Sequence, residues 1–183
     1  MVRDTSNTMH EWSLYLLALD VRAQRLGFVV FDGPSRLQGW GTRRYGGTGQ
    51  RPRGTVATRI NALLDFYTPP VVVIRKPRIH SPETSRHVGD VINAIRIEAK
   101  RRAADVHVVS ATTVKKFFTQ SGLASKDEIA STLAERFEEI TWKLPKKRKK
   151  WQSERYNMLI FDAVATGVAF FASKHATEKV GGD

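Results

Sequence analysis

A single acid, Asp162, interrupts the apolar run Met158-Leu159-Ile160-Phe161-Asp162-Ala163-Val164-Ala165-Thr166-Gly167-Val168-Ala169-Phe170-Phe171. If this run forms one helix, with about 100° between successive residues, Asp162 shares a face with Met158, Leu159, Ala165 and Ala169. The carboxylate then points toward the expected core. Because an unpaired carboxylate is costly to remove from water, Asp162 must be protonated, paired with a cation or bound to a metal ion.

A second acid of this kind stands near the start of the chain. The run Leu14-Tyr15-Leu16-Leu17-Ala18-Leu19 is almost wholly apolar and is followed by Asp20, a pattern typical of a central strand that carries a carboxylate at its C-terminal end. Open α/β sheets place functional groups at the C-terminal ends of their strands. We therefore expect Asp20 and Asp162 to meet at one site.

The composition indicates one soluble globular domain. The chain has 183 residues, of which 41% are hydrophobic, enough for one ordinary core. It has no apolar stretch long enough for a membrane span and no signal sequence in its polar first residues, so we expect no membrane partner. The absence of cysteine excludes disulfides, thiolate nucleophiles and cysteine-ligated zinc, and favours a cytoplasmic location.

The net charge indicates a polyanionic partner. Lys and Arg number 30 against 18 Asp and Glu, which gives a formal charge of +12. Since the sequence shows no basic amphipathic anchor helix, nucleic acid is favoured over an acidic membrane.

The pattern of hydrophobic residues predicts an α/β fold with a mixed five-stranded sheet. The β-branched run Val71-Val72-Val73-Ile74 is typical of a strand buried on both faces of a parallel sheet. We expect a three-stranded meander followed by parallel strands, with helices on both faces. The expected strands cover 14–20, 25–32, 37–45, 71–74 and 106–109, and the expected helices cover 55–66, 84–104, 112–118, 126–140 and 158–171. One domain spans 13–173, between flexible ends at 1–12 and 174–183.

Several segments together resemble the RuvC-type Holliday-junction resolvases of the ribonuclease-H-like superfamily. The resemblance covers residues 13–172. It rests on the order and spacing of four segments, since none of them is specific alone. They are Leu17-Ala18-Leu19-Asp20 with Gly27-Phe28, the strand Val71–Ile74, the segment from Val114-Lys115-Lys116 to Gly122-Leu123-Ala124-Ser125-Lys126, and Asp162-Ala163-Val164-Ala165.

The resemblance implies a ribonuclease-H-like fold, a homodimer, branched DNA as partner and a site where acids hold two Mg²⁺ or Mn²⁺ ions. Two divalent ions about 4 Å apart need bridging oxygens and a negative environment, and they activate water and stabilise the leaving oxygen. Asp20 and Asp162 match two of the family's catalytic acids and are the metal ligands of an active enzyme. Arg75 replaces the family's glutamate, Leu159 replaces its fourth acid, and Arg22 replaces a glycine of the hairpin.

These departures leave two interpretations of the acids. A guanidinium beside two aspartates supplies the positive charge that metal ions otherwise bring, so we hypothesise a metal-poor site in which Arg75 pairs with Asp20 or Asp162. The alternative is a pair of ordinary capping or salt-bridged carboxylates. Glu154, two turns before Asp162, is the best substitute catalytic acid, and Glu83, Asp90 and Glu98 are weaker candidates.

Two basic clusters are candidates for phosphate binding. One is the run Lys146-Lys147-Arg148-Lys149-Lys150, which lies between Trp142 and Trp151. It fits a phosphate-contacting loop with tryptophans for stacking on bases, or else a solvated loop. The other consists of Arg75-Lys76-Pro77-Arg78 with His80, and Arg43, Arg44, Arg51 and Arg53 extend the same surface.

Three functions agree with these observations. The first, which we favour, is a RuvC-like protein that recognises branched or structured DNA with weak or absent nuclease activity. The second is an active Mg²⁺- or Mn²⁺-dependent, structure-selective endonuclease of DNA recombination and repair with a rearranged acid set. The third is a structural subunit of a larger assembly.

Overall fold

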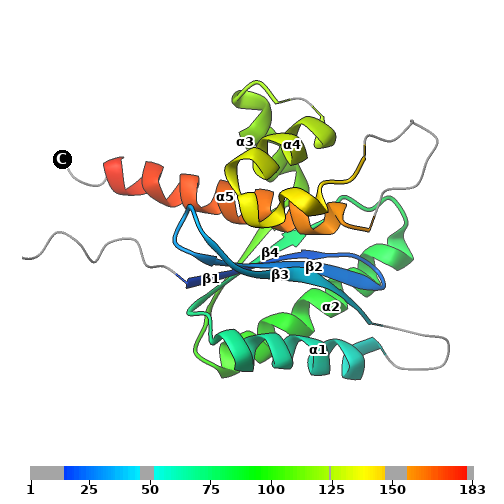
Figure 1. Ribbon diagram of the computed structural model, residues 1–183. Coiled ribbons are helices and arrows are strands. Elements are labelled where there is room, and N and C mark those ends of the chain that lie inside the picture. Colours follow the sequence, from blue (N-terminus) through cyan, green and yellow to red (C-terminus); the bar gives the residue numbers. More distant parts are fainter. Residues whose placement is uncertain (1–14, 46–51, 124, 147–155, 181–183) are drawn as a thin grey trace, which may run out of the picture.

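The computed structural model describes residues 15–45, 52–123, 125–146 and 156–180. Three consecutive strands come first, and helices and strands then alternate as far as the fifth strand (Figure 1). The elements are β1 (Tyr15–Val21), β2 (Arg25–Asp32), β3 (Leu37–Arg44), α1 (Pro52–Tyr67), β4 (Val71–Lys76), α2 (Pro82–Arg101), β5 (Asp105–Ser110), α3 (Ala111–Gln120), α4 (Lys126–Arg136), the 3-10 helix η1 (Glu138–Lys143) and α5 (Met158–Val180).

The five strands form one mixed sheet in the order β3-β2-β1-β4-β5. β1, β2 and β3 are an antiparallel meander, while β4 pairs in parallel with β1 and with β5. The expected fold class, with its meander and its parallel strands, is therefore confirmed. The β-branched run of β4 lies near the centre of the sheet, where both of its faces are covered.

Helices cover both faces of the sheet (Figure 1). α5, with α3 and α4 beyond it, packs on one face, and α1 and α2 pack on the other. Successive residues of β1 alternate between the two layers: Leu16 and Ala18 belong to the core under α5, and Leu17 and Leu19 to the core under α1 and α2. The same alternation directs Asp20 toward α5.

Two glycines allow α5 to lie close against the meander. A Cβ atom on Gly27 of β2 would overlap the carbonyl group of Leu159, and one on Gly167 of α5 would overlap the ring of Phe31. Both positions therefore require a residue without a side chain. The first of these contacts lies one turn from Asp162, so Gly27 brings the acid of α5 within reach of β1.

One predicted helix is wrong in its second half. The helix expected over 126–140 ends at Arg136, because Phe137 takes an extended conformation with φ −121° and ψ 91°. Its buried ring packs edge-on against Phe31 at 5.9 Å between ring centroids, and η1 follows. At the other expected helices the bounds differ by at most three residues, except at the C-terminal end of α5. α2 starts earlier, at Pro82, because Ser81 caps it and proline fits the first turn, and α5 continues to Val180.

Within the described ranges, none of the helices is both long enough and apolar enough to cross a membrane.

Candidate functional site

Asp20 and Arg75 stand side by side at the C-terminal ends of two parallel strands. They are paired residues in the register of β1 and β4, and both side chains face α5. Asp20 has no exposed surface and Arg75 is 7% exposed. Nη1 of Arg75 donates to Oδ1 of Asp20 at 2.7 Å. This is a buried, charge-assisted contact, which is among the stronger kinds of hydrogen bond.

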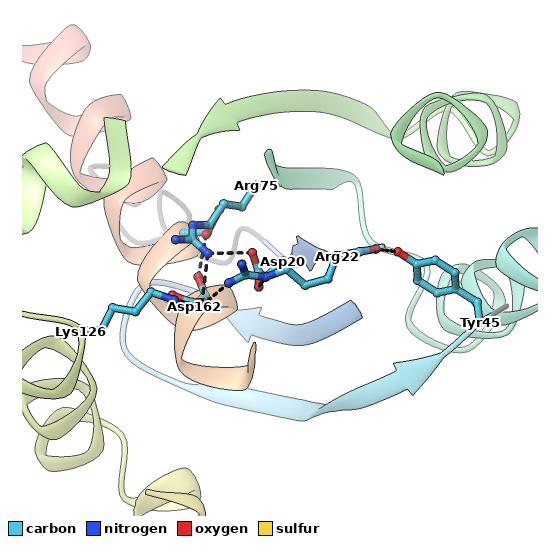
Figure 2. A network of polar contacts seen from close by, with 7 residues as sticks. Asp20, Arg22, Tyr45, Arg75, Lys126 and Asp162 are labelled. Atoms are coloured by element: carbon cyan, nitrogen blue, oxygen red, sulfur yellow. Dashed lines mark hydrogen bonds and ion pairs between the residues drawn. The ribbon is translucent and has the colours of Figure 1, made fainter. Parts of the chain in front are cut away.

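Asp162 reaches the same guanidinium from α5. It is 7% exposed, and its Oδ2 lies 3.3 Å from Nη1 of Arg75. Figure 2 shows Arg75 between the two carboxylates. The predicted pairing of Arg75 with Asp20 or Asp162 is thus confirmed, and it extends to both acids.

A second guanidinium bridges the same two acids. Arg22 donates from Nε to Oδ2 of Asp20 and from Nη2 to Oδ2 of Asp162, each at 2.8 Å (Figure 2). Its backbone is fixed by two hydrogen bonds: the Tyr45 hydroxyl donates to the Arg22 carbonyl, and the Arg22 amide donates to the carbonyl of Arg25 at 2.9 Å. The residue that replaces a hairpin glycine is therefore held in place between the acids.

Lys126 completes the cluster from the start of α4. Its Nζ donates to Oδ2 of Asp162 at 2.9 Å. α4 begins with a capping box in which Ser125 and Glu128 bond to each other's backbone amides, which fixes the position of Lys126. Three cationic side chains thus face two carboxylates, and the formal charge of the five groups is +3 − 2 = +1.

The two carboxyl groups respond differently to these surroundings. Burial raises the pKa of Asp20, and the negative charge of Asp162 raises it further, against the opposing effect of Arg75 and Arg22. Burial also acts to raise the pKa of Asp162, but Arg75, Lys126 and Arg22 together lower it below the usual range. Asp162 therefore keeps its charge, and the first proton taken up by the pair goes to Asp20.

The described residues do not fit the two divalent ions that the resemblance implies. Mg²⁺ and Mn²⁺ prefer several oxygen ligands. In the described part of the chain, no three Asp, Glu, His or Cys side chains gather closely enough to hold a metal ion. Asp20 and Asp162 are already engaged by guanidinium and ammonium groups at 2.7–3.3 Å, whose charge repels a metal cation. The cations of this side-chain set outnumber its carboxylates by one.

A cavity of about 610 Å³ opens onto the cluster, and its lining includes Arg22, Arg75, Lys126 and Asp162. We call it the cationic pocket. Arg78 and Lys115 add two exposed cations, neither of which makes an ion pair with another described residue. The N-terminal residues of α3 and α4 also line it, so two helix N-termini add to the positive potential. Its apolar wall consists of Val114, Ile129, Ala130, Met158, Phe161 and Ala165.

The other predicted DNA-binding residues are distributed around this pocket. Lys76, the last residue of β4, is exposed, and so are Arg78 and His80, which follow the strand. Lys146 lines a neighbouring hollow that shares Ser125, Ala130 and Met158 with the cationic pocket. Trp142 lies elsewhere, in a groove beside β3.

Part of the prediction lies outside the described residues: Arg51, Lys147, Arg148, Lys149, Lys150, Trp151 and Glu154, together with the side chain of Arg53. The weaker acid candidates Glu83, Asp90 and Glu98 all lie on α2, and none forms a three-acid cluster with Asp20 and Asp162. Glu98 pairs instead with Arg101 and Arg102.

Sequence reasoning missed the roles of Arg22, Lys126 and Tyr45. A signal existed for Arg22, because it comes directly after β1 and two residues after Asp20, so continuing the alternation of the strand by one residue directs it toward α5. Lys126 and Tyr45 carry no such local signal. They reach the site through the placement of α4 and through the turn after β1.

No sequence-family profile matches the chain, and no curated protein sequence matches it. Similar solved structures include RuvC of Thermus thermophilus in complex with a Holliday junction substrate, with 18% identity, a TM-score of 0.68 and coverage of 90% of this chain and 97% of that one. Another is the yeast mitochondrial Holliday junction resolvase Ydc2, with 15% identity, a TM-score of 0.65 and coverage of 94% and 85%. A third is the fowlpox virus resolvase with its junction DNA, with 16% identity, a TM-score of 0.54 and coverage of 86% and 99%.

These similarities define the class of fold, which is ribonuclease-H-like. Within that class, the chain has the fold of the RuvC-type resolvases over most of its length.

Proposed function

We propose that this protein binds branched DNA through the cationic pocket and does not cleave it by a two-metal mechanism. The observation that carries the proposal is the double bridge of Arg75 and Arg22 between Asp20 and Asp162. The similar structures support branched DNA as the ligand, since they include two resolvases in complex with Holliday junctions. The net charge of +12 supports a polyanionic ligand independently.

The two acids act as positioning groups in this proposal. Asp20 and Asp162 hold the guanidiniums of Arg22 and Arg75 in fixed orientations at the wall of the cationic pocket. Fixed guanidiniums lose little side-chain entropy when a phosphate binds. Arg78 and Lys115 meet the phosphate backbone at the rim, and the α3 and α4 N-termini add backbone amides.

The same charges oppose metal-dependent cleavage. A catalytic pair of divalent ions needs a negative environment, and the five-residue cluster is positive. Replacement of a catalytic carboxylate by arginine therefore weakens the binding of divalent ions more than its replacement by a neutral residue. The structure-selective endonuclease with a rearranged acid set remains the alternative, and homodimer formation remains a prediction.

The test is a binding and cleavage comparison on four-way, forked and linear DNA. The protein should bind the four-way junction most tightly and yield no cleaved strand with Mg²⁺ or Mn²⁺. The double variant Arg78→Ala/Lys115→Ala should bind more weakly, and the slope of log K against log salt should fall by about two, since each phosphate contact contributes roughly 0.9.

A matched control removes the same charge from the far face of the sheet. Lys100→Ala/Arg101→Ala changes two exposed cations of α2 and should leave the salt slope unchanged. Equal affinity for linear and four-way DNA, or metal-dependent cleavage that Asp20→Asn abolishes, would overturn the proposal. Absence of any DNA binding would favour the structural-subunit reading.

A further inference from the structure

A second hollow lies on the other side of α5 from the cationic pocket. It has a volume of about 460 Å³, within the range of small-molecule sites. Its lining comes from the edge strand β3, the end of α1, η1, the segment that leads into α5 and the first turn of α5. We call it the aromatic groove, because its lining includes Trp40, Tyr67, Trp142 and Tyr156.

The groove and the pocket share one helix. Ile160 lines the groove and Asp162 lines the pocket, and residues two apart on a helix point about 160° away from each other. The two hollows are therefore separated by about one helix diameter, roughly 10–12 Å.

The aromatic side chains differ in how firmly the core holds them. Trp40 and Tyr67 pack partly against the two hydrophobic cores, so their rings are fixed. Trp142 is 70% exposed and Tyr156 is 41% exposed. Large exposed aromatic surfaces are unfavourable in water. Trp142 and Tyr156 are therefore the two rings of the groove that offer most surface for stacking.

Cations lie over the two exposed rings, and none of the described residues that line the groove is acidic. The ammonium of Lys143 lies 3.8 Å from the centroid of the Trp142 ring, and the guanidinium of Arg25 lies 5.6 Å from that of Tyr156. Arg43 donates to the carbonyl of Thr42, another lining residue. The side-chain amide of Gln38 donates to Asp32 and that of Asn157 donates to the carbonyl of Lys143, and each keeps an amide oxygen that can accept from the edge of a base. Aromatic rings interleaved with cations are the combination that binds single-stranded nucleic acid.

We propose that the aromatic groove binds an unpaired DNA base, stacked on the face of Trp142 that Lys143 leaves open. The inference deepens the proposed function and rests on it. It assigns to the β3 edge the recognition of unpaired bases at the branch, while the cationic pocket holds the duplex backbone. Charge complementarity favours DNA over an apolar peptide strand at this edge.

The test uses a forked DNA with 2-aminopurine in its unpaired arm, together with a fully paired four-way junction. Binding of the wild-type protein should quench the 2-aminopurine fluorescence, because the base stacks on the indole. Trp142→Ala should bind the fork roughly 5- to 100-fold more weakly and should not quench the probe. Trp142→Phe keeps an aromatic face and should retain most of the affinity and the quench.

The matched control is Phe66→Ala, since Phe66 is an aromatic residue of α1 that is 79% exposed and does not line the groove. It should match the wild type in affinity and in quenching. Trp142→Ala should also leave the affinity for the fully paired junction unchanged, which separates the groove from the cationic pocket.

Three results would overturn the inference. If Trp142→Ala stays within twofold of Phe66→Ala on the fork while wild-type junction binding persists, the groove proposal fails and the proposed function stands. If Trp142→Ala changes only self-association in sedimentation, the groove is a protein interface. If the wild-type protein binds neither DNA, both proposals fail.

Discussion

Neighbouring residues of the same strands lie on opposite faces of the sheet and enter very different surroundings. Leu19 of β1 and Ile74 of β4 enter a continuous apolar layer under α1 and α2. Asp20 and Arg75, one residue further along, enter a charged cluster under α5. The apolar layer and the apolar part of the α5 face form the two hydrophobic cores. The charged cluster lies where the parallel strands end, the place at which α/β sheets carry their functional groups.

A buried ion cluster is weak evidence of stabilisation. The cost of removing each charge from water offsets most of the attraction between the charges, whereas the loss of one partner leaves the others uncompensated. The stability of the apolar face does not depend on a balance of opposite charges. This difference predicts that the charged face responds to single substitutions and to pH in ways that the apolar face does not.

The largest effect is expected for Arg75→Ala, which removes the guanidinium that contacts both acids. It should lower the free energy of unfolding by about 3–5 kcal/mol, since Asp20 and Asp162 lose their most buried counter-charge. Urea denaturation measures this change. Lys76→Ala, at the exposed neighbouring position, should stay within about 0.5 kcal/mol of the wild type.

The comparison is sharper with the triple variant Asp20→Leu/Arg75→Met/Asp162→Leu, which converts the charged cluster to an apolar one. It should recover most of the stability lost in Arg75→Ala, because well-packed apolar groups replace buried ion pairs at little cost. If the triple variant is less stable than Arg75→Ala, the acids and the guanidinium stabilise the fold in their own right.

A smaller effect is expected in the dependence of stability on pH. The pKa of Asp162 is lowered in the folded state, so its stabilisation is present above the usual aspartate pKa of about 3.9 and is lost as the pH falls further. The pKa of Asp20 is raised in the folded state. Its ionised form therefore destabilises the folded protein near neutral pH, and this destabilisation is relieved as the pH falls toward the usual aspartate pKa of about 3.9.

Unfolding measured between pH 7 and pH 3 should therefore show opposite trends for two variants. The advantage of the wild type over Asp162→Asn should shrink as the pH falls below about 4, while the wild type should gain relative to Asp20→Asn. Parallel trends for the two variants would contradict the assignment of the first proton to Asp20.

The sequence predicted the sheet well because its signals are local. The β-branched run of β4 and the apolar run of β1 each define a buried strand without reference to the rest of the chain. The expected helix over 126–140 was wrong beyond Arg136, because the burial of Phe137 against Phe31 is a tertiary effect. Local propensity cannot register such a contact.

The site was predictable only where strand geometry imposes it. The meeting of Asp20, Arg75 and Asp162 follows from a parallel pair of strands and a helix with an inward acid. The second bridge by Arg22 needed attention to the alternation along β1. Lys126 enters through the packing of α4 near α5, a relation between elements that no pattern in the sequence encodes.

The most direct test of the central claim, that guanidinium groups take the place of metal ions, is calorimetric titration with Mn²⁺. The wild-type protein should show no tight binding, because Arg22 and Arg75 already neutralise Asp20 and Asp162. Arg22→Gly/Arg75→Glu should bind Mn²⁺, and Asp162→Asn added to this variant should remove the binding. Tight binding of two ions by the wild-type protein, lost in Asp20→Asn, would contradict the claim.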